Sequence, residues 1–273
     1  MQKGVYRQLN LTHLETALPQ VFSLARAETW TYETFLERAL TAELDGREQK
    51  ALARRLKSAR IPTKKTLDGF DFSFQPSLSE RRLRELADLS FVRTCTNVIF
   101  LGPPGTGKTH LSLALADRAL AAGHSVLFTT LADLAQALES ASHPGLLRQR
   151  LRRYIVPSLL VIDEVGYTKL TSEQARHLFE LVTARYEHGS IILTSNTSFA
   201  QWGSLLGDEV LATALLDRLL HHAEVIPING RSYRMKERQT GLSVPSEATL
   251  AALGAPSDRR LLTGAQTASP GAV

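Results

Sequence analysis

The chain has 273 residues, a net charge of +5 and a single cysteine, Cys95. One cysteine excludes an intrachain disulfide framework and a zinc site built from several cysteines, and it suits the reducing cytoplasm. The first ten residues lack the apolar core of a signal peptide, and no apolar run approaches the roughly 20 residues that a membrane span needs. We therefore expect a soluble cytoplasmic protein that has no membrane partner.

Helical patterns fill the first sixty residues. Thr12-His-Leu-Glu15 has the form of a capping box, and helical spacing follows it as far as Pro19. Residues 32–58 show helical periodicity and are rich in Ala, Leu, Glu, Arg and Lys. The sequence predicts a small all-helical N-terminal domain over residues 1–66.

This N-terminal region is also the basic end of the chain. It contains 12 Lys and Arg against 7 Asp and Glu. On a helical wheel several of the basic residues fall in one arc, opposite Leu52, Leu56 and Ala59. A solvated charged face and a contact with DNA phosphates both remain open for such a stripe. The candidate DNA contacts here are Arg47, Lys50, Arg54, Lys57, Arg60, Lys64 and Lys65.

A connector links the helical region to the rest of the chain. Residues 66–77 are predicted to be extended, because Phe70, Phe72 and Phe74 alternate with polar residues. Ser77-Leu-Ser-Glu80 then caps a helix that runs to about residue 90. The second domain is predicted over residues 67–240, and the aperiodic Ser, Ala, Gly, Pro and Thr of residues 241–273 predict a disordered tail.

From residue 97 onward the hydrophobic period alternates between strand and helix, which predicts an α/β domain with a doubly wound, five-stranded parallel sheet. Two helices separate the second and third strands, and the second of them carries the further candidate DNA contacts Arg148, Arg152 and Arg153. The predicted strands are 97–101, 125–129, 158–163, 190–195 and 223–228, and the predicted helices are 107–122, 131–140, 146–154, 171–187 and 208–221.

The strongest chemical signal is Gly-x-x-x-x-Gly-Lys-Thr, directly after the first strand. Its glycines allow successive backbone N–H groups to turn toward a polyphosphate, and the helix that follows adds its positive dipole end. Lys108 is predicted to reach the β and γ phosphates of ATP, and Thr109 to bind Mg²⁺. A glycine-rich turn that binds nothing is the structural alternative. The predicted nucleotide-binding residues are Gly102, Pro103, Pro104, Gly105, Thr106, Gly107, Lys108, Thr109 and His110.

Polar side chains end the third and fourth predicted strands. Asp163 is predicted to hold Mg²⁺, directly or through water, and Glu164 to polarise the attacking water as a general base. The strand over 190–195 ends in hydroxyls and an amide, of which Asn196 is the predicted group that orients this water. An ordinary solvated turn is the alternative at both places.

Together these segments resemble the AAA+ ATPases of the initiator and helicase-loader branch. Within that branch the chain is most similar to the IstB-like transposition helper proteins, through the connector 66–77 and Arg81-Arg-Leu-Arg-Glu-Leu-Ala87 after it. The resemblance spans about residues 10–240. The other segments that carry it are Gly102–Thr109, Leu159–Gly166, Leu193–Asn196, Asp217–Leu219 and Gly230-Arg-Ser-Tyr-Arg234.

The resemblance implies a P-loop ATPase that uses ATP and Mg²⁺, forms homo-oligomers on double-stranded DNA, and helps the transposase of an insertion sequence to select or deform its target. It implies that Arg218 crosses to the γ-phosphate of a neighbouring subunit, although a helix cap or a surface ion pair is the alternative. Arg234 is a candidate second phosphate sensor. The helix over 146–154 corresponds to an insertion by which initiator-type members approach DNA.

Since the region after Arg234 is short and polar, the usual AAA+ helical lid is expected to be missing, and Phe72 and Phe74 are expected to contact the adenine.

Two other functions compete with this interpretation. They are a replicative helicase loader of the DnaC type and a small-molecule kinase with the same phosphate loop. His221 and His222 are predicted to be helix-end residues, because no third ligand lies at metal spacing in the sequence.

Overall fold

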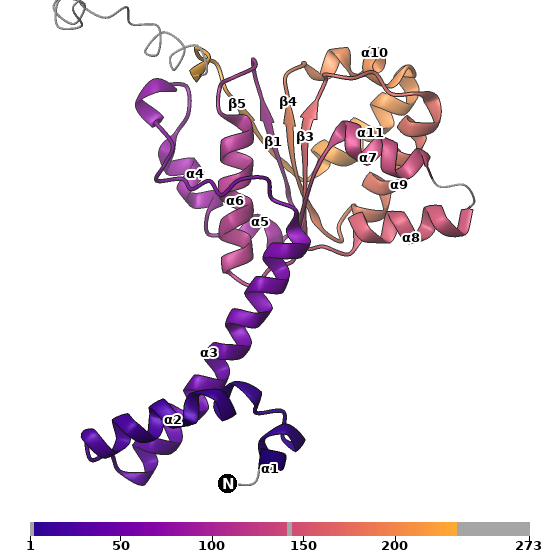
Figure 1. The fold of residues 1–273 in the computed structure, drawn as a ribbon. Coiled ribbons are helices and arrows are strands. Elements are labelled where there is room, and N and C mark those ends of the chain that lie inside the picture. Colours follow the sequence, from indigo (N-terminus) through magenta and orange to yellow (C-terminus); the bar gives the residue numbers. More distant parts are fainter. Residues whose placement is uncertain (1–2, 141–143, 234–273) are drawn as a thin grey trace, which may run out of the picture. The chain divides into compact units, whose positions relative to one another are not determined.

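A five-stranded parallel sheet forms the centre of the α/β domain (Figure 1). In this computed structural model, which describes residues 3–140 and 144–233, the strands lie in the order β2-β3-β4-β1-β5. All neighbouring pairs are parallel, so the predicted sheet is confirmed, and each strand ends within two residues of its predicted bounds. The strands are β1 (Asn97–Leu101), β2 (Val126–Thr130), β3 (Leu159–Val165), β4 (Ser190–Ser195) and β5 (Ala223–Pro227).

Helices cover both faces of the sheet because the strands are apolar on both faces. In β1, Val98 and Phe100 pack on one side and Ile99 on the other, and all three are fully buried. The first face packs against α4 (Glu80–Leu86), α5 (Ser90–Arg93) and α6 (Lys108–Ala121). The other packs against α7 (Leu131–Glu139), α8 (Pro144–Ile155), α9 (Ser172–Arg185), α10 (Trp202–Leu206) and α11 (Glu209–His221).

The five helices predicted between the strands are confirmed, but other local predictions are wrong. The helix predicted over 77–90 is divided into α4 and α5 at Leu89, which has a φ of 59°. This turn lets apolar residues of both short helices pack into one core cluster. The α4 cap is Ser79, not Ser77. The sequence also gave no indication of η2 (Phe199–Gln201) and α10 after β4.

The connector is not extended. Residues Phe72–Phe74 form the short 3₁₀ helix η1. The side chain of Asp71 caps it by accepting a hydrogen bond from the N–H of Phe74 at 3.2 Å. An aspartate that binds the backbone ahead of it favours a turn over a strand, and this local contact outweighs the alternating phenylalanine pattern.

Three helices form the N-terminal region: α1 (Lys3–Gln8), α2 (Thr12–Ala27) and α3 (Tyr32–Ala59). They have a small apolar cluster of their own, made by Leu14, Leu18, Val21 and Ala39. At its other end α3 packs Ala59, fully buried, into the core cluster of the α6 face. The separate cluster supports a helical domain, and the exact boundary near residue 66 stays a prediction. Residues 234–273, with the predicted tail, lie outside the described residues.

The predicted start and end of α2 are both wrong. Thr12 is the first helical residue and Leu11 the N-cap, with no capping hydrogen bond from its side chain. Pro19 lies inside the helix, which continues to Ala27. A proline removes one helical hydrogen bond, but burial of one face of α2 in the apolar cluster stabilises the helix across it.

A buried carboxylate caps α2 from another helix. Glu43 of α3 is only 3% exposed, and it accepts hydrogen bonds from the N–H of Leu14 at 2.6 Å and from Nε of Arg47 at 2.7 Å. Burial by itself would raise the pKa of Glu43, but the hydrogen bonds from Arg47 and Leu14 lower it below its usual value. Arg47 also donates to the carbonyl of Asn10, so this predicted DNA contact stabilises the helical region.

A buried arginine fixes the start of two strands. Arg185, at the end of α9, is 1% exposed, and burial lowers its pKa to about 10, so it stays protonated at neutral pH. Its guanidinium donates to backbone carbonyls that end α8 and begin β3 and β4. These belong to Tyr154, Ile155, Pro157, Ser158 and Ser190.

Among the helices of residues 3–140 and 144–233, none combines the length and the apolar character that crossing a membrane requires.

Replacing Glu43 with alanine should destabilise the helical region by about 2 kcal/mol, because a buried N–H and a guanidinium lose their charged acceptor. Since the pKa of Glu43 is lowered on folding, its stabilising effect is present at neutral pH and is lost as the pH falls through the folded-state pKa. Urea denaturation followed by circular dichroism at neutral and acidic pH measures both effects. Glu48→Ala, exposed on the same helix, is the control, and an equal loss there would contradict this role.

Candidate nucleotide-binding site

The loop between β1 and α6 encloses its own lysine. Lys108 is the first residue of α6 and is 8% exposed. Its Nζ donates hydrogen bonds to the carbonyl oxygens of Gly102 and Pro103, each at 2.7 Å. The first N–H groups of α6 belong to the same loop, so an ammonium and a helix N-terminus lie together, as an anion site requires.

Gly105 and Gly107 have left-handed backbone conformations, with φ of 78° and 96°. Other segments also approach both residues closely. A Cβ atom at Gly105 would lie 2.1 Å from Oγ of Ser232, and one at Gly107 would lie 2.5 Å from the ring of Phe70. Both glycines are therefore required by backbone conformation and by close packing.

The buried carboxylate of Asp163 joins three elements. Asp163 lies at the end of β3 and is 3% exposed. The hydroxyl of Thr109, on α6, donates to its Oδ1 at 3.1 Å, and the hydroxyl of Thr194, on β4, donates to the same oxygen. The two predicted magnesium ligands thus lie together. Sequence reasoning did not identify Thr194, although it noted the hydroxyls at this strand end.

Glu164 follows Asp163 but lies in a different environment. It is exposed and has a φ of 65°, where the register between β3 and β4 shifts at a bulge. Its backbone N–H donates to Oγ1 of Thr194 at 3.1 Å, which fixes this unfavourable conformation. Bulges redirect side chains, so adjacent acids give one buried carboxylate and one that reaches solvent.

Asn196 lies just beyond β4, at the same edge of the sheet. Its side chain packs on Gly166, where a Cβ atom would be 2.3 Å from Oδ1 of Asn196. Within residues 3–140 and 144–233 this buried Oδ1 finds no hydrogen-bond partner. A buried acceptor of this kind is suited to a water or a ligand donor. The preceding residue, Ser195, accepts a hydrogen bond from the N–H of Gly102, so Asn196 is close to the start of the loop.

Phe70 is the connector aromatic that lies on the phosphate loop. Its ring meets the ring of His110 edge-on, with centroids 5.3 Å apart, and that of Phe72 at 5.0 Å. Phe74 lies instead against Tyr233, at 5.3 Å. The predicted adenine contacts Phe72 and Phe74 are both half-buried at this surface, and their role stays a prediction.

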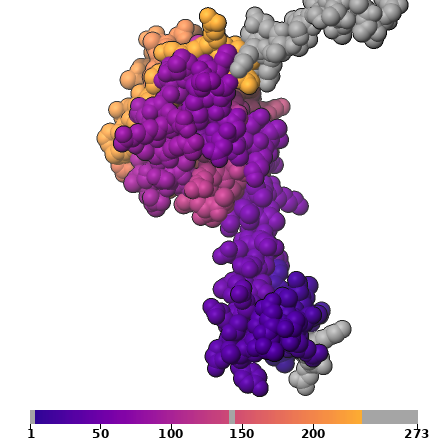
Figure 2. Space-filling view, turned by 90° about the vertical axis from the view of Figure 1, so that its left-hand side faces the viewer, coloured from indigo at the N-terminus to yellow at the C-terminus, as the bar shows by residue number. Residues whose placement is uncertain are grey.

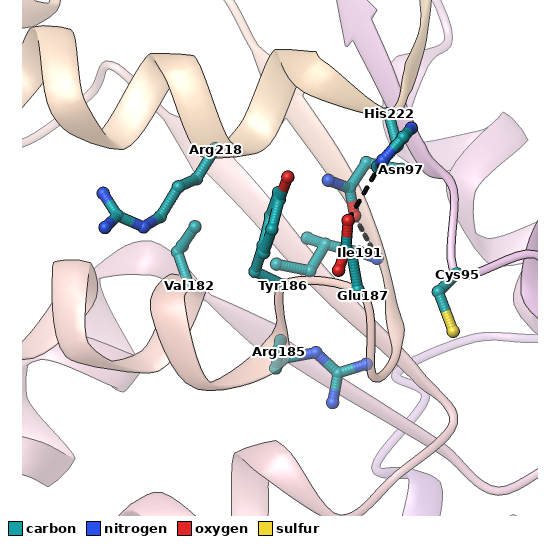
Figure 3. A pocket seen from close by; sticks show the side chains of 9 residues that line it. All are labelled: Cys95, Asn97, Val182, Arg185, Tyr186, Glu187, Ile191, Arg218 and His222. Carbon is teal, nitrogen blue, oxygen red and sulfur yellow. Dashed lines mark hydrogen bonds and ion pairs between the residues drawn. The ribbon is translucent and has the colours of Figure 1, made fainter.

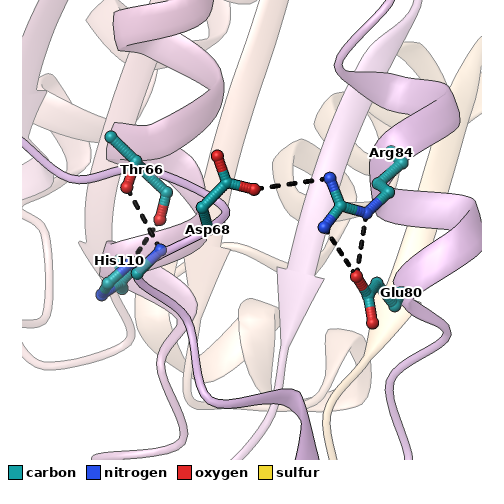
Figure 4. A network of polar contacts seen from close by, with 6 residues as sticks. Thr66, Asp68, Glu80, Arg84 and His110 are labelled. Carbon is teal, nitrogen blue, oxygen red and sulfur yellow. Dashed lines mark hydrogen bonds and ion pairs between the residues drawn. The ribbon is translucent and has the colours of Figure 1, made fainter.

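Polar contacts attach the first part of the connector to α4 and α6. Nε2 of His110, on α6, is 2.9 Å from the carbonyl oxygen of Thr66 (Figure 4). Arg84, on α4, contacts Asp68 of the connector at 3.5 Å and Glu80 at 2.7 Å (Figure 4). The predicted nucleotide residue His110 therefore fixes the connector in this structure.

The connector also contacts the chain after β5. Gln75, which is buried, donates to the carbonyl of Arg231 at 2.9 Å, and the hydroxyl of Ser77 accepts from the N–H of Asn229 at 3.0 Å. Figure 2 shows purple residues of this region beside the yellow residues that follow β5. Since the N–H of Tyr233 donates to the carbonyl of Gly105, segments from three parts of the chain surround the loop. The predicted sensor Arg234 lies outside the described residues.

Arg218 is far from this loop within its own chain. Residues of α11 lead into β5, which is parallel to β1, so the end of α11 lies at the edge where the strands begin. The phosphate loop follows the other end of β1. The guanidinium of Arg218 lies 4.6 Å over the ring of Phe179. Arg218 is also one of the residues that line a small pocket with Glu187 and His222 (Figure 3).

All ten predicted DNA contacts are exposed, in two groups. One group lies on the second half of α3 and the segment after it, and the other on α8. Arg47 forms an ion pair with Glu43 at 2.7 Å. Among the described residues, the other members of the two groups form one weak ion pair, between Lys64 and Asp117 at 4.0 Å. The neighbouring Arg150 differs, because it donates to the carbonyl of Ala137 and the hydroxyl of Ser140 and so attaches α8 to α7.

The fold and the site define the class of this protein. A parallel sheet in the order β2-β3-β4-β1-β5, a Gly-Lys-Thr loop after β1 and an acidic pair at the end of β3 are features of P-loop ATPases of the AAA+ type. The chain belongs to the IstB-like ATP-binding protein family, whose family model matches residues 5–241.

Two relatives come from insertion sequences. The chain is 46% identical over 242 residues to the proposed ATP-binding protein of insertion sequence IS5376 of Geobacillus stearothermophilus, covering 88% of this chain and 96% of that protein. It is also 46% identical over 232 residues to the corresponding IS21 protein of Pseudomonas aeruginosa, covering 85% of this chain and 88% of that protein.

Two solved structures share the fold. The DnaC helicase loader has a TM-score of 0.51 at 24% identity, covering 60% of this chain and 96% of that chain. The AMPPCP-bound DnaA of Aquifex aeolicus has a TM-score of 0.52 at 21% identity, covering 71% of this chain and 60% of that chain. Together they confirm the predicted fold class.

Gly107→Ala should reduce the affinity for Mg-ATP at least tenfold, because the added methyl group displaces the loop from Phe70. Gly123→Ala is a matched control, since Gly123 has a similar φ of 94° but open space at the Cβ position. Both substitutions should lower stability by about 1 kcal/mol through the left-handed conformation. Titration with a fluorescent ATP analogue and urea denaturation measure the two effects, and equal nucleotide affinity in both variants would contradict the assignment.

Proposed function

We propose that this protein is an ATP-hydrolysing helper of an insertion-sequence transposase, and that it assembles on duplex DNA. The observation that carries the proposal is the pairing of a buried Asp163, hydrogen-bonded to Thr109, with an exposed Glu164 beside the phosphate loop. The relatives at 46% identity, which are named as ATP-binding proteins of insertion sequences, support the transposition context.

The residues of the loop fit a triphosphate and its magnesium ion. Lys108 would exchange its two carbonyl acceptors for phosphate oxygens, with the α6 N–H groups around it. Thr109 and Asp163 offer two hard oxygen ligands only 3.1 Å apart, which suits Mg²⁺. When bound, Mg²⁺ neutralises charge on the phosphates.

Glu164 is proposed as the general base for hydrolysis. Its carboxylate is free to meet a water from the solvent side, and the backbone contact with Thr194 fixes the direction in which it points. We assign Thr194 as a positioning residue, because it contacts both Asp163 and the N–H of Glu164. Asn196, whose buried Oδ1 has no hydrogen-bond partner in the part of the chain that the structure describes, is the proposed group that orients the attacking water.

Arg218 is proposed to act on the neighbouring subunit. Its position at the opposite edge of the sheet separates it from the phosphates of its own chain. A guanidinium that completes the site of a neighbour would neutralise charge on the transferring phosphoryl group, and it would make hydrolysis depend on assembly. The proposed assembly is therefore a homo-oligomer that forms with nucleotide and DNA.

The two exposed basic groups are proposed to bind the phosphates of duplex DNA. Apart from Arg47, which is paired with Glu43, these side chains reach solvent without a close acidic partner among the described residues, and such groups suit phosphate contacts that depend little on DNA sequence. Such binding suits a helper protein that presents many target sites to a cognate transposase. The likeness to the DnaC helicase loader lies below 25% identity and shows the fold alone, so no observation favours the loader function.

Lys108→Ala and Glu164→Gln should separate nucleotide binding from hydrolysis. Loss of the ammonium should abolish ATP binding and ATP-dependent assembly on DNA, whereas the amide should preserve both and slow turnover by about 100-fold or more. Calorimetry with Mg-ATP, phosphate release and electron microscopy of the DNA complex measure the three steps. Normal turnover in Glu164→Gln would exclude this residue as the base.

Arg54→Glu combined with Lys57→Glu should weaken duplex binding and reduce the salt dependence of affinity. Each lost phosphate contact should lower the slope of log K against log salt by about 1. Gel-shift titrations at several salt concentrations, with ATP present, measure the slope. The control is Arg26→Glu combined with Arg176→Glu. It changes the net charge by the same amount at exposed positions outside the two basic groups. An equal effect of both pairs, or no duplex binding at low salt, would contradict the DNA assignment.

A further inference from the structure

Two turns bring a glutamate and two histidines together at the edge where the strands begin. Glu187 lies in the turn between α9 and β4, whereas His221 and His222 lie where α11 leads into β5. One ligand atom from each side chain lies within 4.8 Å of the others. Nε2 of His222 is 3.4 Å from Oε1 of Glu187 (Figure 3). The third group that the sequence prediction missed is therefore supplied by a distant turn.

The surrounding contacts orient these side chains. The hydroxyl of Tyr186 is 2.6 Å from Nδ1 of His221, and its ring stacks on both histidines at 5.8 and 6.2 Å. Glu187 has a φ of 59°, and the turn is closed by hydrogen bonds from the N–H groups of His188 and Gly189 to the carbonyl of Arg185. An unfavourable backbone conformation thus places the carboxylate opposite the imidazoles.

We infer that Glu187, His221 and His222 form a binding site for a divalent transition ion, with Zn²⁺ as its representative. Two imidazole nitrogens and one carboxylate oxygen are a donor set that zinc accepts, with water as the fourth ligand. Ligand atoms about 2.0–2.2 Å from a tetrahedral ion lie roughly 3.3–3.6 Å apart, and the distance of 3.4 Å between Glu187 and His222 has this value.

The remaining ligand must move by roughly 1.2–1.5 Å at most, which exposed side chains allow. The side chains of His222 and Glu187 are 48% and 57% exposed, so an ion can enter from solvent. Nitrogen donors discriminate against Mg²⁺, so this site differs in chemistry from the oxygen ligands beside the phosphate loop. The hydroxyl of Tyr186 would orient His221, as partners of metal-binding histidines do.

An ion at this site would tie the α9–β4 turn to the end of α11. Arg218 lies one turn earlier on α11 and lines the same small pocket as Glu187 and His222. The ion would therefore fix the part of the helix that presents Arg218. This consequence rests on the proposed function of Arg218, whereas binding of the ion does not.

Zinc binding to the untagged full-length chain, without nucleotide, tests the site. Competition with a chromogenic zinc indicator should show one ion per chain, and zinc should raise the thermal unfolding temperature. Glu187→Gln and His222→Ala should each lower zinc affinity at least tenfold and abolish the thermal shift. The matched control is His188→Ala, since His188 is exposed in the same turn but outside the cluster.

The proposal would be overturned if Glu187→Gln and His222→Ala had the same zinc affinity as the unchanged chain. It would also be overturned if the unchanged chain did not bind zinc at micromolar concentration. Lys108→Ala should bind zinc like the unchanged chain, because the phosphate loop lies at the other edge of the sheet. Failure of the nucleotide function and failure of the zinc site can therefore be distinguished.

Discussion

The site depends on the contact between the carboxylate of Asp163 and two hydroxyls. Thr109 brings the first turn of α6 to this carboxylate, and Thr194 brings the end of β4. Since Thr194 also accepts the hydrogen bond from the N–H of Glu164, one small network orients both acids. A buried acid beside the loop and an exposed acid next to it have different chemistry, although they are adjacent in the sequence.

The direction of the parallel strands separates two functional regions. The phosphate loop, the acidic pair and Asn196 lie where strands end, whereas Arg218 and the Glu187–histidine cluster lie where strands begin. A rigid sheet keeps these edges apart within one chain. A neighbouring chain can bring them together, so the proposed ATPase would sense its own assembly through the end of α11. The basic residues of α3 and α8 would link that assembly to DNA.

Much of the fold follows from local patterns. The strands, the helices between them and the phosphate loop were predictable because hydrophobic period and the Gly-Lys-Thr motif act over a few neighbouring residues. The errors in α2 have tertiary causes, whereas the connector was mispredicted because a local contact of Asp71 favours a turn. Pro19 does not end α2, because one face of that helix is buried. The cap of α2 comes from Glu43, which lies on another helix and has no local pattern to identify it.

The sequence by itself determined the class of chemistry, since a loop of glycines, one lysine and one threonine after an apolar strand has few uses other than phosphate binding. Only the tertiary structure decided which aromatic residue meets the loop, which hydroxyl orients the acids, and that Glu187 faces two histidines. These contacts join residues that are distant in the chain. Their geometry depends on strand order and on turns, and no local spacing encodes it.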